Sequence, residues 1–97
     1  MKIVILDEAE KDLSAGYDFY ERQAQGIGDY FLDSIFADID SLLLFAGIDR
    51  VIFGKHRLLA KRFPFGIYYT VEDEEIRIHA VLDLRRDPDW IRKRLSE

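Results

Sequence analysis

If this sequence has a site for chemistry, its best candidate side chains lie between positions 56 and 90. Cleavage of an RNA backbone through its 2′-hydroxyl needs a base for the hydroxyl proton, cations for the phosphate and an acid for the leaving oxygen. His79 is a candidate proton carrier, because an imidazole titrates near neutral pH. The candidate cations are Arg57, Lys61 and Arg85. If the chain is a nuclease, these four residues are its predicted catalytic set.

The same stretch can instead form a surface that binds a partner without chemistry. Planar guanidinium groups and large aromatic rings are common at the centres of protein interfaces. The residues that we predict to contact a partner are Arg57, Lys61, Arg62, Arg85, Arg86 and Trp90. A lone histidine on a strand is more often structural than catalytic, and Trp90 also has a structural interpretation, in which it packs the last helix onto a sheet. We therefore favour binding over catalysis.

Charge is distributed unevenly along the chain. Residues 1–49 carry 3 basic and 11 acidic side chains, whereas residues 50–71 carry 5 basic and no acidic ones. Residues 72–97 carry 6 basic and 8 acidic side chains, and the net charge of the whole chain is −5. This acidity argues against non-specific nucleic-acid binding. The basic segment is either a solvated strand face or a patch for an acidic partner.

The sequence carries no motif for a metal or a cofactor. It has no cysteine, and its two histidines, His56 and His79, stand apart without further ligands at a metal-binding spacing. It also has no glycine-rich phosphate loop. We therefore expect neither a metal nor a cofactor, and we expect the carboxylates of the N-terminal half to face solvent.

Length and hydropathy restrict the class of protein. At 97 residues the chain is expected to form one domain. The first apolar run ends after residue 6, where acidic residues begin, and it is too short for the hydrophobic region of a secretory signal. No run approaches the roughly 20 apolar residues of a membrane helix. We therefore expect a cytoplasmic protein without a membrane partner.

Hydrophobic periodicity predicts one strand and two helices in the first half of the chain. Lys2–Leu6 is a candidate buried strand. Asp7 is a candidate N-cap, with Glu10 in a capping-box arrangement, for a helix that ends near Gln25. A second amphipathic helix is predicted over residues 27–46, where a glycine ends it.

The second half predicts three strands, over residues 56–63, 67–71 and 76–84. Residues 47–55 have no clear pattern and are interpreted as a loop or an irregular strand. Of the adjacent Tyr68 and Tyr69, one is expected in the core and the other on the surface. A final helix is predicted from Asp87 as N-cap to about Leu95.

The strand predicted at 76–84 alternates cleanly between apolar and polar residues. Its apolar face consists of Ile76, Ile78, Ala80, Leu82 and Leu84. We expect Leu82 and Leu84 to face the helical hairpin, with Ile35 and Ile39 among their neighbours. The predicted order is β-α-α-β-β-β-α. It indicates an α+β fold with an N-terminal strand, an antiparallel helical hairpin packed on an antiparallel sheet, and a short C-terminal helix.

With these elements and motifs, nearly the whole chain resembles the RelE/ParE superfamily of type II toxin–antitoxin toxins, and its ParE-like branch in particular. The ParE-like pattern is a pair of arginines, an apolar run, Phe-Pro-aromatic, paired tyrosines, and Arg-Asp-Pro before an aromatic residue. Here it is matched by Arg57, Phe63–Phe65, Tyr68, Tyr69, Arg86–Pro88 and Trp90. The sequence departs from the pattern at His56, where an arginine is common.

The resemblance implies a toxin of the plasmid-stabilisation type that inhibits DNA gyrase. It also implies a cognate antitoxin, whose acidic or amphipathic tail folds onto the toxin. Such a toxin acts by binding, so we expect an inhibitor and not an enzyme. The alternatives are a RelE-like ribosome-dependent mRNA endonuclease and an inactive relic that only binds its antitoxin. RelE-like nucleases commonly carry a histidine, tyrosine or lysine near the C-terminus, where this chain has Trp90 followed by Ile-Arg-Lys-Arg.

Overall fold

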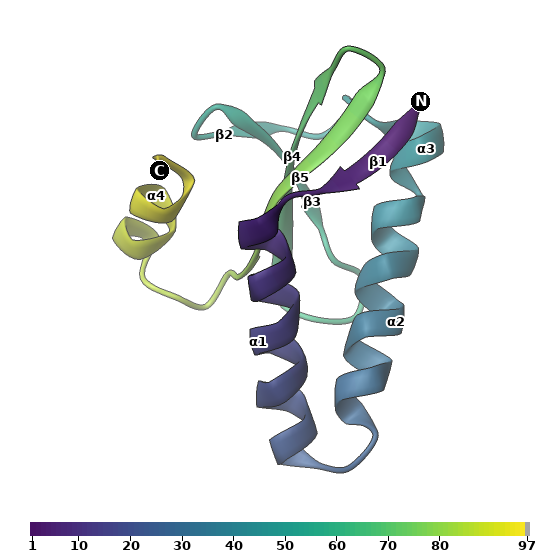
Figure 1. The fold of residues 1–97 in the computed structure, drawn as a ribbon. Helices are drawn as coiled ribbons and strands as arrows, with labels where there is room; N and C mark the ends of the chain where they lie inside the picture. Colours follow the sequence, from purple (N-terminus) through teal and green to yellow (C-terminus); the bar gives the residue numbers. More distant parts are fainter. Residues whose placement is uncertain (97) are drawn as a thin grey trace.

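The computed structural model describes residues 1–96, which form a five-stranded sheet with helices on both faces (Figure 1). The helices are α1 (Asp7–Gln23), α2 (Ile27–Asp40), α3 (Leu42–Phe45) and α4 (Pro88–Ser96). In sheet order the strands are β1 (Lys2–Ile5), β5 (Glu75–Asp83), β4 (Phe65–Glu72), β3 (Lys55–Leu59) and β2 (Val51–Ile52). β1 is parallel to β5, and the other neighbouring pairs are antiparallel. The predicted α+β fold is confirmed.

The long helices α1 and α2 form a hairpin that covers one face of the sheet (Figure 1). The larger core lies beneath them, and we call it the hairpin-side core. Its buried residues are Ala9, Leu13, Phe31, Ile35, Ile39, Leu42, Phe65, Ile67, Tyr69, Ile76, Ile78 and Val81. The two helices can approach closely because residue 16 is glycine: a β-carbon there would lie 2.5 Å from Cε2 of Phe31. None of the helices in the described part of the chain combines the length and the apolarity that a membrane span requires.

The short helix α4 packs on the opposite face over a smaller core, which we call the α4-side core. Its buried residues are Tyr68, Ala80, Leu82, Ile91 and Leu95. Trp90 is half-buried against this core, in agreement with its structural interpretation. The helix starts as the sequence predicts, because Oδ1 of Asp87 accepts the backbone N–H of Asp89 at 3.0 Å.

A β-bulge in β5 lets one strand contribute to both cores. Tyr68 pairs with Ala80 and Tyr69 pairs with Ile78, so that His79 has no opposite residue on β4. An extra residue in one strand shifts the alternation of side chains from that point onward. The strand therefore presents a different set of residues to the helical hairpin before and after the bulge.

The alternation predicted for this strand is consequently wrong beyond Ile78. Leu82 and Leu84 do not face the isoleucines of α2, because the bulge places them on the α4 side. Val81 lies in the hairpin-side core instead of Leu82. The expectation of one exposed tyrosine is also wrong. Tyr68 and Tyr69 are both buried, one in each core, since helices cover both faces of the sheet.

The first helix begins without the predicted capping box. Its N-cap is Leu6, and no side chain caps it, so the pairing of Asp7 with Glu10 as a capping box is wrong. The physical reason is that Leu6 still belongs to the sheet: its N–H donates to the carbonyl oxygen of Ile78 at 3.0 Å. The chain passes directly from β1 into α1, which ends at Gln23.

The second predicted helix is divided in two. α2 ends at Asp40 and α3 begins after Ser41, whose hydroxyl donates to the carbonyl oxygen of Asp38 at 2.6 Å. Such a bond from serine back to the preceding turn competes with the helical ladder. Residues 47–55 contain β2 and a two-residue turn into β3, an ordered hairpin that the sequence pattern does not predict.

Candidate functional site

The C-terminal end of α4 is attached to α1 and β3 by polar contacts. Nη2 of Arg94 donates to Oδ2 of Asp12 at 2.8 Å and to the carbonyl oxygen of Glu8 at 3.2 Å. Nζ of Lys55 donates to the carbonyl oxygen of Leu95 at 2.9 Å, which satisfies one of the free carbonyl groups at the end of the helix. Side chains from distant parts of the sequence thus determine where α4 lies.

Asp12 is at the centre of this arrangement. Its Oδ2 also accepts the backbone N–H of Val81 at 3.0 Å, at a point where β1 no longer pairs with β5. Burial raises the pKa of the Asp12 carboxyl above its usual value, while the hydrogen bonds from Val81 and Arg94 act in the opposite direction. One carboxylate therefore connects α1 both to β5 and to α4.

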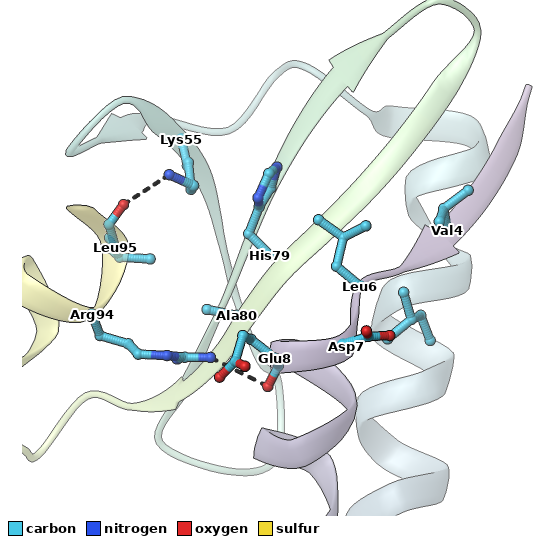
Figure 2. Close-up of a pocket in the computed structure, with 10 residues that line it drawn as sticks. Val4, Leu6, Asp7, Glu8, Lys55, His79, Ala80, Arg94 and Leu95 are labelled. Carbon is cyan, nitrogen blue, oxygen red and sulfur yellow. Dashed lines mark hydrogen bonds between the residues drawn. The ribbon is translucent and has the colours of Figure 1, made fainter. Parts of the chain in front are cut away.

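A hollow of about 630 Å³ lies on one side of the Asp12–Arg94 pair, and we call it the His79 hollow (Figure 2). It is lined by Val4, Ile5, Leu6, Asp7, Glu8, Lys55, His79, Ala80, Arg94 and Leu95. Figure 2 shows His79 between Lys55 on one side and Leu6 on the other. Nε2 of His79 lies 2.8 Å from the hydroxyl of Thr70. Burial and then the nearby Lys55 lower the pKa of His79.

A second hollow of about 420 Å³ lies on the other side of the pair, and we call it the Trp90 hollow. It is lined by Asp12, Ala15, Gly16, Phe19, Phe65, Val81, Leu82, Asp83, Arg86 and Trp90. The guanidinium carbon of Arg86 lies 3.7 Å from the centre of the Trp90 ring, which is a cation–π contact. Two of the six predicted partner-binding residues therefore meet beside a hollow of mixed apolar and charged lining.

Arg57 and Arg85 lie outside both hollows. Arg57 is on the α4 side of β3 opposite Tyr68, and its buried Nε has no hydrogen-bond acceptor among the described residues. Nη2 of Arg85 donates to Oδ2 of Asp83 at 2.7 Å, and this hydrogen bond is the main reason that the pKa of Asp83 is lowered. Arg85 is therefore already engaged with a carboxylate.

Lys61 and Arg62 have exposed side chains in the connection between β3 and β4. The backbone N–H of Lys61 donates to Oδ2 of Asp38 at 3.1 Å, which ties this connection to α2. Their side chains are free to meet a partner from solution. They contribute to neither hollow described above.

The four candidate nuclease residues are not gathered at one place. His79 lines the His79 hollow, whereas Arg57, Lys61 and Arg85 line neither hollow. Of these four residues, only His79 therefore borders either hollow. Within residues 1–96 there is also no group of three side chains placed to hold a metal ion.

Three residues that shape the site are missing from the predicted set, namely Asp12, Lys55 and Arg94. For Asp12 the sequence contained a signal: it lies three residues after Ala9 and four before Gly16, inside the apolar stripe of its helix. For Lys55 and Arg94 it contained none, because their partners are 40 and 82 residues away along the chain.

The prediction that the helical carboxylates face solvent is wrong for Asp12 and Asp38. Asp38 is only 4% exposed, and its carboxylate accepts the N–H of Lys61. The helical repeat again places it beside buried positions, three residues after Ile35 and four before Leu42. A carboxylate inside an apolar stripe indicates a buried hydrogen bond, because an unsatisfied one would be costly there.

Comparisons with known proteins agree with this fold. The family described as "ParE toxin of type II toxin-antitoxin system, parDE" matches residues 3–88, which end where α4 begins. Among solved structures, a chain of "Chromosomal ParDE TA system from P. aeruginosa" is similar, with a TM-score of 0.76 and 26% sequence identity. The similarity covers 84% of this chain and 92% of that chain. A comparison with curated proteins found no significant match.

Proposed function

Since the chain belongs to the ParE toxin family of type II toxin–antitoxin systems, we propose that it inhibits DNA gyrase and that a cognate antitoxin neutralises it. The observation that carries the proposal is the contrast within the site. Arg86 and Trp90 are paired beside a hollow, while the candidate proton carrier and cations are dispersed. Inhibition by binding needs a complementary surface and no acid–base pair, so this toxin acts without chemistry of its own.

The antitoxin is proposed to contact the basic segment of the chain, where residues 50–71 carry five cations and no acid. An acidic or amphipathic tail that folds onto this segment would be steered by its charge. Arg57 is half-buried, so the exposed Lys61 and Arg62 provide the cleaner test. Reversal of both charges to glutamate should slow association and reduce its dependence on salt.

Stopped-flow measurements at several ionic strengths would check the association rate. The matched control reverses Lys11 and Arg22, two exposed cations of α1 outside the basic segment. If the Lys61/Arg62 variant keeps both the rate and the salt slope of the wild type, the basic segment takes no part in neutralisation.

The target is tested with purified gyrase. The wild-type toxin should block supercoiling, and the antitoxin should restore it. Arg86→Ala should weaken inhibition about tenfold, as expected for an interface arginine, whereas His79→Ala should inhibit normally. Arg92→Ala is the matched control, since Arg92 is an exposed arginine of α4 that pairs only locally with Asp89.

Two other outcomes would overturn the proposed mechanism. Ribosome-dependent mRNA cleavage by the wild type, lost in His79→Ala, would identify a RelE-like nuclease. A wild-type chain that binds its antitoxin but arrests neither supercoiling nor translation would identify a relic without toxic activity. Each outcome is visible with the wild type and a single variant.

A further inference from the structure

The sheet contains two hairpins closed by two-residue turns, and these turns differ in the residues they use. Residues 73–74 join β4 to β5, and residues 53–54 join β2 to β3. All four residues have a positive φ: 50° for Asp73, 65° for Glu74, 52° for Phe53 and 82° for Gly54. A two-residue hairpin turn of type I′ has this left-handed backbone at both of its positions.

Two of the four, Phe53 and Glu74, are neither glycine nor aspartate, and of these Phe53 is the apolar one. Left-handed backbone crowds the β-carbon, and outside glycine it is mainly asparagine and aspartate that adopt it. Burial of the ring does not explain the choice, since Phe53 is 49% exposed whereas Phe31 and Phe65 in the core are at most 7% exposed. Strain that the fold does not require is typical of residues kept for a function.

The surroundings of Phe53 are apolar and basic. Val51, on the short edge strand β2, is 56% exposed. Arg50 and Lys55 flank the hairpin, and no acidic residue occurs between positions 50 and 71. In Figure 1, β2 and its turn extend from the body of the sheet on the side of α4, away from α1 and α2. The turn therefore carries a half-exposed aromatic residue at the projecting end of the basic segment.

We propose that Phe53 anchors the toxin to its target protein by inserting into an apolar recess with an acidic rim on a folded partner. This inference rests on the proposed function, in which the target is gyrase. A projecting ring is complementary to a preformed recess, as at the centres of many protein interfaces. The flexible tail of an antitoxin is instead held along a groove or along a sheet edge, and the tip of a hairpin offers neither. Within the basic segment, the tip of this hairpin is thus assigned to the target, and the connection that carries Lys61 and Arg62 is assigned to the antitoxin.

Phe53→Asn separates this role from a structural one. Asparagine favours the left-handed turn, so the variant should unfold at a higher temperature than the wild type. Its toxicity on induced expression, and its inhibition of purified gyrase, should nevertheless fall at least tenfold, with antitoxin affinity unchanged. Asp73→Asn, in the equivalent turn of the other hairpin, is the matched control and should keep full toxicity. Phe53→Tyr should also keep it, because the ring is retained.

The remaining outcomes separate this inference from the proposed function. If the wild type arrests growth without inhibiting gyrase, while Phe53→Asn loses toxicity, the gyrase proposal fails and the role of Phe53 stands. Toxicity of Phe53→Asn within twofold of the wild type overturns the role of Phe53. A loss of antitoxin binding in this variant also overturns that role. The same holds if the wild type forms a concentration-dependent dimer that the substitution abolishes. A wild-type chain that arrests no growth overturns both.

Discussion

The two faces of the sheet are covered in different ways. On the hairpin side, the long helices α1 and α2 bury a large, almost entirely apolar core that includes Phe31 and Ile78. On the other side, the nine-residue helix α4 buries a core of only five residues, and a single ion pair, Asp12–Arg94, lies between two hollows. The first face is held mainly by burial and the second largely by directional polar contacts.

This difference separates the part of the molecule that stabilises the fold from the part available for recognition. Elements that make few buried apolar contacts open at a lower free energy than the rest of a domain. α4 is such an element, and it carries Trp90 and borders both hollows. We therefore expect the α4 side to open at a lower free energy than the helical hairpin. The predictions that follow test this contrast.

The largest loss of stability is expected for Phe31→Ala on the hairpin side. Phe31 is fully buried, and its ring packs against Gly16, where no side chain can collapse into the space that is left. The free energy of unfolding should fall by about 3–5 kcal/mol, from lost burial and from the cavity. Urea denaturation followed by circular dichroism would measure it. A loss smaller than that of Leu82→Ala would contradict the assigned difference between the faces.

An intermediate and local loss is expected for Asp12→Ala. The substitution removes the acceptor for Val81 and leaves Arg94 buried without its partner, at a cost of about 2–3 kcal/mol. Hydrogen exchange should accelerate first in α4 and at the end of β5, while α2 stays protected. Asp18→Ala, at an exposed position of the same helix, is the control and should change neither region. Uniform acceleration over the whole chain would show that the two faces open together.

Leu82→Ala should cost about 2 kcal/mol, the lower end of the range for such truncations. Leu82 is buried under α4, a short helix that can move into the space, and not under the helical hairpin. Differential scanning calorimetry of this variant beside Val81→Ala compares the two faces at adjacent positions of one strand. If Leu82→Ala lowers the free energy of unfolding by as much as Phe31→Ala or by more, the α4 side is packed as tightly as the hairpin side.

The smallest expected effect is a pH dependence of opposite sign at Asp83 and Asp12. Arg85 lowers the pKa of Asp83, so this carboxylate stabilises the fold above its unfolded pKa, and the stabilisation is lost as the pH falls through the folded value. The pKa of Asp12 is raised by burial, so its contribution is greatest at low pH and declines as the pH rises through the folded value.

The free energy of unfolding should be measured as a function of pH for the wild type and for an asparagine variant at each position. The difference between the wild type and each variant would show the two opposite signs. The advantage of the wild type over Asp83→Asn should shrink below about pH 4, and it should stay within about 1 kcal/mol because Arg85 is largely exposed. The advantage over Asp12→Asn should instead increase toward low pH. Curves of the same sign for both pairs would contradict the assigned environments.

Much of the fold was predictable because local patterns report it. The helical stripes around Leu13 and Ile35, and the apolar runs of β1, β4 and β5, indicate which elements form and in which order. The candidate site was predictable only in part. Arg86 and Trp90 belong to one motif and lie together, whereas the residues that hold α4 in place come from three separate elements.

The sequence by itself determined the α+β class, the helical hairpin and the start of α4 at Asp87, because each depends on residues within a few positions of one another. Only the tertiary structure decided which face Leu82 occupies, since the bulge at His79 exists only through the pairing of β5 with β4. It likewise decided that Asp12 is partly buried and shared between Val81 and Arg94. The reason is physical: a register and a hydrogen-bond partner are properties of two segments brought together, and neither segment contains that information alone.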